Sequence, residues 1–185
     1  NIKSGDEVIT AANTFVATVG AITEIGAKPV FVDCDDTFCM NVDLIEKKIT
    51  QKTKAIVPVH FTGYMTNMIK LSKISKKFKI PVIEDACQSI LGSINNKNAG
   101  VWGDFGAFSL HPLKNINVWS DGGVITTNNR KDYNKLLLLR NHGLIDRDTV
   151  KICGYNSRLD TFQAVVGNWL LPKAKFIANQ RIKNA

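Results

Sequence analysis

The sequence lacks several features that would assign it to a familiar class. No apolar run reaches the roughly 18 to 20 residues of a transmembrane helix, and the first residues show no signal-peptide pattern. The four cysteines include no Cys-x-x-Cys pair, and the three histidines are widely spaced. Reduced thiols in a cytoplasmic protein are therefore expected, without a metal site. A Gly-x-Ser-x-Gly elbow of hydrolases, internal repeats and low-complexity segments are also missing.

Positive charge is in excess, but it is dispersed along the chain. The net charge of +8 is compatible with a nucleic-acid ligand, yet aromatic residues do not alternate with the lysines. Lys70, Lys73 and Lys77 share one side of an expected helix whose other side is apolar, which is typical of a solvated helix face. A nucleic-acid-binding module remains an unfavoured alternative, and it predicts affinity that falls steeply with salt.

The sequence does contain alternating strand and helix patterns. Hydrophobic residues make up 44% of the 185 residues, enough for one sizeable core. Strands are expected at residues 8–10, 29–33, 55–60, 82–83, 107–109 and 124–127. Helices are expected after a cap at Asn13 or Thr14, with Phe15, Val19 and Ile22 on one face, and at residues 42–49, 67–78 and 131–140. The strands are nearly continuous apolar runs, which predicts an α/β fold with a mostly parallel sheet covered on both faces.

Two shorter signals complete this outline. The polar residues 95–98 are expected to form the tip of a hairpin. Ser157-x-x-Asp160 resembles a capping box before a helix that would bury Leu159, Phe162, Val166 and Trp169. Pro172 is expected to interrupt that helix. The chain begins at Asn1 rather than Met and stops inside an expected helix, so we expect it to be part of a longer protein.

A carboxylate and an amine each follow a core strand. Asp85 comes directly after an apolar strand, and ligands of parallel sheets lie beyond the carboxyl ends of strands. A helix cap or a metal ligand are alternatives, but no second ligand has suitable spacing, and Glu84 should face the opposite side. Lys114 follows Pro112 and the strand ending at Ser109. Partial burial would make its amine available to condense with an aldehyde.

An acid and an amine that converge in this way fit pyridoxal phosphate. The ring nitrogen of that cofactor needs a negative partner to stay protonated, and its aldehyde condenses with a lysine. Gln88 would donate to the ring hydroxyl oxygen, or else be a surface amide. Ser109 would donate to the phosphate. Phe15 would stack on the ring, although by itself it suits a plain core position.

An ordered set of short motifs extends over nearly the whole chain, and the motifs are specific jointly rather than singly. They are Gly5–Ile9, Thr14–Thr18, Gly26–Asp33, Pro58–His60, Val82–Gln88, Phe108–Asn115, Asp121–Gly123, Arg140–Gly143 and Gly154–Arg158. Together they resemble the DegT/DnrJ/EryC1/StrS family of sugar aminotransferases that depend on pyridoxal phosphate.

The resemblance implies a fold-type-I large domain and a homodimer whose active site is shared between subunits. Residues 1–170 would form the central part of that domain, and residues 171–185 would begin the helix leading to a C-terminal small domain. Lys114 would be the Schiff-base lysine and Asp85 the partner of the ring nitrogen, with Gln88, Ser109 and Phe15 in the roles given above. Asn156 would reach the phosphate from the neighbouring subunit.

The resemblance also implies the reaction. An amino group would move from an amino acid, glutamate, to a nucleotide-linked keto-sugar in amino-sugar or surface-polysaccharide biosynthesis. Two alternatives remain within the same fold. One is a sensor or regulatory protein that binds the cofactor without turnover, and the other is a transaminase of a cyclitol or another keto compound. Neither a membrane nor a nucleic acid is expected as a partner.

Overall fold

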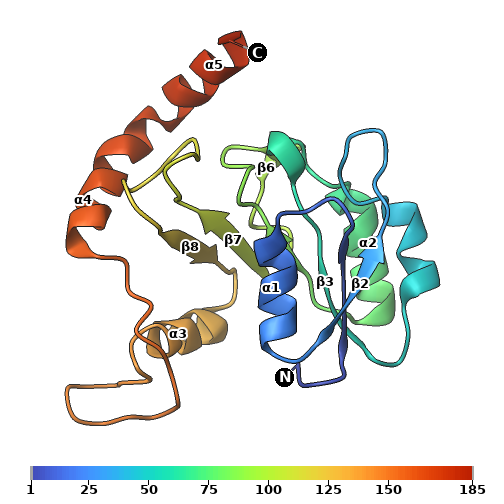
Figure 1. Ribbon diagram of the computed structural model, residues 1–185, viewed down its shortest axis with the longest axis horizontal. Coiled ribbons are helices and arrows are strands. Elements are labelled where there is room, and N and C mark those ends of the chain that lie inside the picture. The colour runs from blue at the N-terminus through green and yellow to red at the C-terminus, as the bar shows by residue number, and fades with distance from the viewer. Residues whose placement is uncertain (1, 185) are drawn as a thin grey trace. The chain divides into compact units, whose positions relative to one another are not determined.

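The structure, a computed structural model, describes residues 2–184 of the chain (Figure 1). It contains two compact units that divide between Phe108 and Ser109. The first unit holds the parallel sheet, and the second unit holds most of the helical C-terminal part. The expected division into a large domain at residues 1–170 and an exit helix at residues 171–185 stays a prediction.

The sheet of the first unit is parallel, as expected from its apolar strands. Its strands are β1 (Glu7–Ala11), β2 (Lys28–Val32), β3 (Thr53–Val57), β4 (Ile83–Asp85) and β7 (Phe105–Ser109). β1 lies between β2 and β3, and β4 pairs with β7. Parallel bridges from Ile56 to Val82 and from Val59 to Asp85 join β3 to β4. The carboxyl ends of these strands therefore share one edge.

Helices α1 (Val16–Glu24) and α2 (Met68–Phe78) cover opposite faces of this sheet (Figure 1). Val8 of β1 packs in one buried cluster with Ile22 of α1, whereas Ile9 packs in another cluster with Leu71 of α2. Successive strand residues point to opposite faces, so these two clusters lie on the two sides of the sheet. The predicted α/β layering is confirmed.

The expected capping of α1 is wrong. The N-cap residue is Phe15, which gives no side-chain cap. The side chain of Asn13 donates instead to the Phe38 carbonyl, and the Thr14 hydroxyl bonds the Thr18 hydroxyl. Both polar side chains are therefore engaged elsewhere, and the helix begins later than the sequence suggests.

The lysine-striped helix is α2, as predicted. The Asn67 side chain accepts from the Lys70 amide at its start, and Lys79 in the left-handed conformation ends it. Lys70 lies 3.0 Å from Asp43, and Lys77 lies 2.6 Å from Glu46. All four side chains are largely exposed, which fits a solvated helix face.

Residues 42–49 do not form the single helix expected from the sequence. They form two short 3₁₀ turns, η1 (Val42–Leu44) and η2 (Glu46–Lys48). A 3₁₀ geometry places residues three apart on the same side, and it buries Val42 and Ile45 together. An isolated helix of this length is marginal, so the burial of two apolar side chains decides the local conformation.

The expected hairpin is present between β5 (Ser93–Ile94) and β6 (Lys97–Asn98), which pair antiparallel. Its tip residues, Asn95 and Asn96, have φ values of 50° and 60°. Positive φ at both central residues is typical of a type I′ turn, and asparagine tolerates that conformation.

The second unit contains the elements that follow Ser109. They are β8 (Gly123–Thr126), α3 (Arg130–Leu139), α4 (Thr161–Leu170), the 3₁₀ turn η4 (Leu171–Lys173) and α5 (Ala174–Asn184). The Asn129 side chain caps α3 by accepting from the amides of Lys131 and Asp132. Pro172 lies in the turn between α4 and α5, where the helix was expected to be interrupted.

Two expectations about α4 are wrong. The capping box is formed by Asp160 and Gln163 rather than by Ser157 and Asp160. Ser157 lies three residues before the N-cap residue Asp160, in the segment whose amide at Ser157 donates to the Arg140 carbonyl. Only Val166 of the expected inward side chains is buried, and the exposed fractions of Phe162 and Trp169 are 64% and 59%. The apolar stripe of α4 is wider than the surface that covers it within the second unit.

Candidate functional site

The backbone of Asp85 is held on both sides by neighbouring strands. Its amide donates to the Pro58 carbonyl at 2.9 Å, and its carbonyl accepts from the His60 amide at 3.0 Å. On its other side it pairs in parallel with Ala107 of β7. Asp85 is the last residue of β4, so its side chain stands at the carboxyl edge of the sheet, as predicted.

The side chain of Asp85 is held by two further donors. The Thr18 hydroxyl donates to Oδ2 at 2.6 Å, and the Cys87 amide donates to Oδ1 at 3.2 Å. The residue is half-buried, and within residues 2–184 no lysine, arginine or histidine forms an ion pair with it. A carboxylate in this setting favours a positively charged ligand atom.

Gln88 lies on the same edge, just beyond β4. Its Oε1 accepts from the Thr62 amide at 2.8 Å, which identifies the oxygen of the side-chain amide. Its NH₂ group is therefore directed elsewhere, and it has no partner among the residues described. The NH₂ group of this half-buried side chain is available to donate to a ligand, and its predicted contact with the cofactor ring stays a prediction.

Phe15 is not a core residue, and that interpretation of the sequence is wrong. Its exposed fraction is 69%, and it stands at the start of α1, a single turn away from Thr18. An exposed aromatic face at this position is available to stack on a flat ligand.

Lys114 lies in the second unit, on the loop between β7 and β8. Its amide donates to the His111 carbonyl at 2.9 Å, and the Leu113 amide donates to His111 Nδ1 at 3.2 Å. The loop therefore turns tightly just before the lysine. Lys114 is half-buried, and its amine has no hydrogen-bond or ion-pair partner in the described part of the chain.

Ser109, the last residue of β7, also falls in the second unit. Its Oγ accepts from the His111 amide at 3.2 Å, so its hydroxyl proton remains available for a further acceptor. The same loop thus presents an amine and a hydroxyl donor. The roles predicted for them, a Schiff-base lysine and a phosphate-binding serine, stay predictions.

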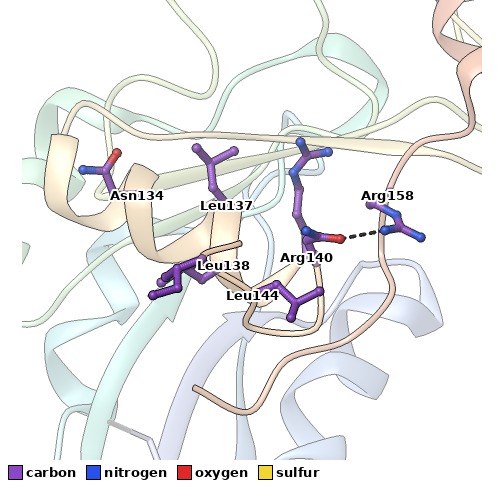
Figure 2. A pocket seen from close by; sticks show the side chains of 8 residues that line it. Asn134, Leu137, Leu138, Arg140, Leu144 and Arg158 are labelled. Carbon is purple, nitrogen blue, oxygen red and sulfur yellow. Dashed lines mark hydrogen bonds between the residues drawn. The ribbon is translucent and has the colours of Figure 1, made fainter. Parts of the chain in front are cut away.

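Asn156 is exposed and is carried by an extended segment of the second unit. It forms an antiparallel bridge with Asn141, and the next amide donates to the Arg140 carbonyl. A cavity of about 540 Å³ lies beside this segment, lined by leucines of α3, Arg140 and Arg158 (Figure 2). Arg158 Nη1 donates to Asn141 Oδ1 at 2.7 Å (Figure 2). The Arg140 side chain has no hydrogen bond within residues 2–184.

The predicted site residues fall into two groups. Asp85, Gln88 and Phe15 belong to the first unit, and Lys114, Ser109 and Asn156 belong to the second. The convergence of the two groups on one ligand stays a prediction.

A buried pair beneath Asp85 was given no role by the sequence. Glu84 and His60 are both 0% exposed, and His60 Nε2 lies 3.0 Å from Glu84 Oε2. His60 Nδ1 accepts from the Thr66 amide at 3.3 Å. The proton of this imidazole therefore lies on Nε2 and is donated to Glu84.

Glu84 also anchors the segment that leads into β7. Its two oxygens accept from the amides of Gly100, Trp102 and Gly103 at 2.9, 2.6 and 2.8 Å. Burial by itself raises the pKa of this carboxyl, but the hydrogen bonds from His60 and the glycine amides outweigh it and hold the pKa below its usual range. The alternation of β4 did predict that Glu84 faces away from Asp85, and this is confirmed.

Thr18 is the other residue that the sequence analysis missed. The sequence feature that could have identified Thr18 is its position three residues after Phe15, on the side of α1 that is buried together with Ile22.

Within residues 2–184, no group of three histidine, cysteine, aspartate or glutamate side chains has metal-binding geometry. No helix in that range combines the length and the apolar character needed to cross a bilayer.

Known proteins match most or all of the chain. The model of the DegT/DnrJ/EryC1/StrS aminotransferase family matches residues 1–185. A pleiotropic regulatory protein of Geobacillus stearothermophilus is 43% identical over 100% of this chain and 50% of its own. A UDP-N-acetyl-3-dehydro-α-D-glucosamine 3-aminotransferase of Acidithiobacillus ferrooxidans is 45% identical over 89% of this chain and 45% of its own.

A solved structure shares the fold. NtdA from Bacillus subtilis, with bound cofactor PMP, superimposes with a TM-score of 0.83 at 37% identity, over 90% of this chain and 38% of its own. The chain thus spans about half the length of the curated relatives it matches, or less. The predicted fold-type-I architecture is confirmed. Because the family model matches residues 1–185, the chain belongs to the DegT/DnrJ/EryC1/StrS aminotransferase family.

Proposed function

We propose that the protein is a pyridoxal-phosphate-dependent aminotransferase that moves an amino group from an amino acid to a nucleotide-linked keto-sugar. The observation that carries this proposal is Asp85, a carboxylate at the carboxyl edge of the sheet, fixed by Thr18 and the Cys87 amide and lacking a cationic partner within the described chain. One relative, from Acidithiobacillus ferrooxidans, is by its name a UDP-N-acetyl-3-dehydro-α-D-glucosamine 3-aminotransferase, which supports a nucleotide-linked keto-sugar as the acceptor.

The donor set in the chain fits the cofactor. Asp85 would face the protonated ring nitrogen, and the Gln88 NH₂ group would face the ring hydroxyl oxygen. The Ser109 hydroxyl would donate to the phosphate, and Phe15 would stack on the ring. Lys114 would hold the cofactor covalently through its amine, which has no partner among the residues that the structure describes.

Asp85 and Lys114 would hold and transfer the protons of the reaction. Bound pyridoxal phosphate supplies an electron sink that stabilises negative charge at the substrate carbon. Asp85 keeps the proton on the ring nitrogen, which the electron sink requires. Once the amine of the donor, glutamate, has replaced it on the cofactor, the freed Lys114 Nζ would take the proton from the α-carbon of that donor. It would later deliver a proton to the carbon of the acceptor that becomes the amine-bearing carbon.

The assembly and the setting belong to the same proposal. Asn156 is exposed on the second unit and would reach the phosphate of the neighbouring subunit in a homodimer. A cytoplasmic location, where the thiols stay reduced, is part of this proposal. The product would serve amino-sugar or surface-polysaccharide synthesis.

The decisive experiment uses the full-length protein. Borohydride treatment of the cofactor-loaded protein should fix the label on Lys114, as mapped by peptide mass spectrometry. Lys114→Ala should abolish amine transfer to a panel of keto-sugar nucleotides, with glutamate as the donor. Recovery of the label on another lysine would refute the role of Lys114.

A regulatory role is the second candidate, because the Geobacillus relative that matches the whole chain carries a regulatory name. In that case the protein would bind the cofactor through the same residues but would transfer no amine from any donor in the panel. Cofactor binding without turnover would therefore select the regulatory candidate over the enzyme.

A further inference from the structure

Two threonine hydroxyls form a short chain that ends on Asp85. Thr14 Oγ1 lies 2.7 Å from Thr18 Oγ1, and Thr18 Oγ1 lies 2.6 Å from Asp85 Oδ2. Thr18 is 8% exposed and faces the sheet from the first turn of α1. The two threonines are four residues apart, so their side chains come side by side where the chain enters the helix.

The donor and acceptor in each of these two hydrogen bonds follow from the carboxylate of Asp85, at which the series ends. An ionised carboxylate only accepts hydrogen bonds, so the Thr18 hydroxyl must donate to Asp85. Its single proton is then used, and the bond to Thr14 must be donated by the Thr14 hydroxyl. The order is therefore Thr14 to Thr18 to Asp85, with every proton assigned.

We propose that Thr18, oriented by Thr14, is a positioning residue that sets the rotation of the Asp85 carboxylate toward the cofactor ring. The Cys87 amide holds Oδ1 and Thr18 holds Oδ2, so the carboxylate plane has a partner on each oxygen. Hydroxyl bonds of this length to a carboxylate are strong. This inference rests on the proposed function, because it assumes that Asp85 meets the ring nitrogen.

The neighbouring threonine of α1 has a different setting and serves as a control. Thr23 is exposed, and among residues 2–184 its hydroxyl donates to no group but the Val19 and Gly20 carbonyls of its own helix. Replacing threonine by valine keeps the shape and removes the hydroxyl at either position. Thr23→Val should therefore leave cofactor binding unchanged.

The test measures the dissociation constant of pyridoxal phosphate by equilibrium dialysis on the full-length protein. Thr18→Val should raise this constant roughly tenfold, as expected for the loss of one hydrogen bond to a charged group. Thr18→Ser keeps the hydroxyl and should stay within about threefold of the wild type. Thr14→Val should give a smaller loss, of about two- to fourfold, because Thr18 still donates but is no longer oriented.

Each outcome decides the question. Equal affinity of Thr18→Val and wild type would overturn the inference while leaving the proposed function intact. Loss in Thr18→Ser as large as in Thr18→Val would also overturn it, since the methyl group rather than the hydroxyl would then matter. Failure of wild type to bind the cofactor would overturn both proposals. If Thr18→Val does not fold, as judged by thermal melting without cofactor, wild-type affinity in Thr14→Val would reject the inference.

Discussion

Adjacent residues of β4 carry carboxylates with opposite surroundings. Glu84 is fully buried and accepts four hydrogen bonds, from one imidazole and three amides. Asp85 faces the other side of the strand, is half-buried, and accepts from Thr18 and the Cys87 amide. Glu84 is saturated by the fold, whereas Asp85 keeps acceptor capacity for a ligand. Strand alternation therefore separates a structural acid from a binding acid.

Replacing Glu84 by glutamine should lower the free energy of unfolding by roughly 3 kcal/mol. The glutamine would present an NH₂ group to some of the amides that now donate to the carboxylate, and it would remove the negative charge that all four donors share. Urea unfolding of both proteins would measure the loss. Glu24→Gln, at an exposed position of α1, should change the stability by less than about 0.5 kcal/mol.

The lowered pKa of Glu84 also predicts a pH dependence. Because the folded carboxyl has a lower pKa than the unfolded one, its contribution to stability is present above the unfolded pKa, roughly 4.3, and is lost as the pH falls through the folded value. The stability gap between wild type and Glu84→Gln should be constant from pH 7 to about pH 5 and should narrow in more acidic buffer. A gap that widens on acidification would contradict this assignment.

At the scale of elements, the structure shows which of two candidate residues caps α4, Ser157 or Asp160; the sequence is compatible with both. Asp160→Ala should destabilise the protein by about 1 kcal/mol, because the Asp160 side chain accepts from the Phe162 amide. Ser157→Ala should have a much smaller effect, since Ser157 is in an extended segment. Thermal unfolding of the two variants would compare them directly. An equal loss of stability in the two variants would favour the capping box of Ser157 and Asp160 that the sequence suggested.

The loop that carries Asn156 depends on a glycine. Gly143 has a φ of 73°, and a Cβ there would overlap the carbonyl of Ile152. Gly143→Ala should therefore lower the free energy of unfolding by more than about 2 kcal/mol, measured by urea unfolding.

Gly20 is the opposite case, because it lies in α1 and no atom lies near the Cβ that a substitution would add. Gly20→Ala should stabilise the protein by roughly 0.5 to 1 kcal/mol.

Local patterns predicted the elements well where the deciding forces were local. The helix at residues 67–78, the hairpin tip within residues 95–98 and the parallel strands all follow from short-range signals. The single helix at residues 42–49 was wrong because burial of Val42 and Ile45 selects a tighter turn. The buried face of α4 was wrong because sequence alone does not show how much of an apolar stripe a neighbour covers.

The candidate site shows the same limit. Asp85, Gln88 and Ser109 could be placed because they follow strands, and strand ends share an edge. Thr18 could not be paired with Asp85, since the two are 67 residues apart in the chain. The bond between Glu84 and His60 spans 24 residues and depends on the order of β3 and β4. Long-range partners of this kind need the three-dimensional arrangement.

For the molecule as a whole, the proposed shared active site makes a quantitative prediction. Lys114→Ala and Asn156→Ala should each be nearly inactive as homodimers of the full-length protein. Mixing the two after dissociation should restore about a quarter of wild-type activity, because half the dimers would be hybrids with one intact site of two. The measurement is amine transfer to a keto-sugar nucleotide before and after mixing. Activity that stays absent after verified subunit exchange would place Asn156 and Lys114 in the same subunit's site, or reject one of their roles.

The clamped main chain at Asp85 has a thermodynamic consequence. Pro58, His60 and Ala107 immobilise it from two directions, so the acid is already in place before any ligand arrives. Its amide should therefore be among the slowest to exchange with deuterated solvent, with or without ligand. Preorganisation of this kind removes the entropy loss that a mobile carboxylate would suffer on association.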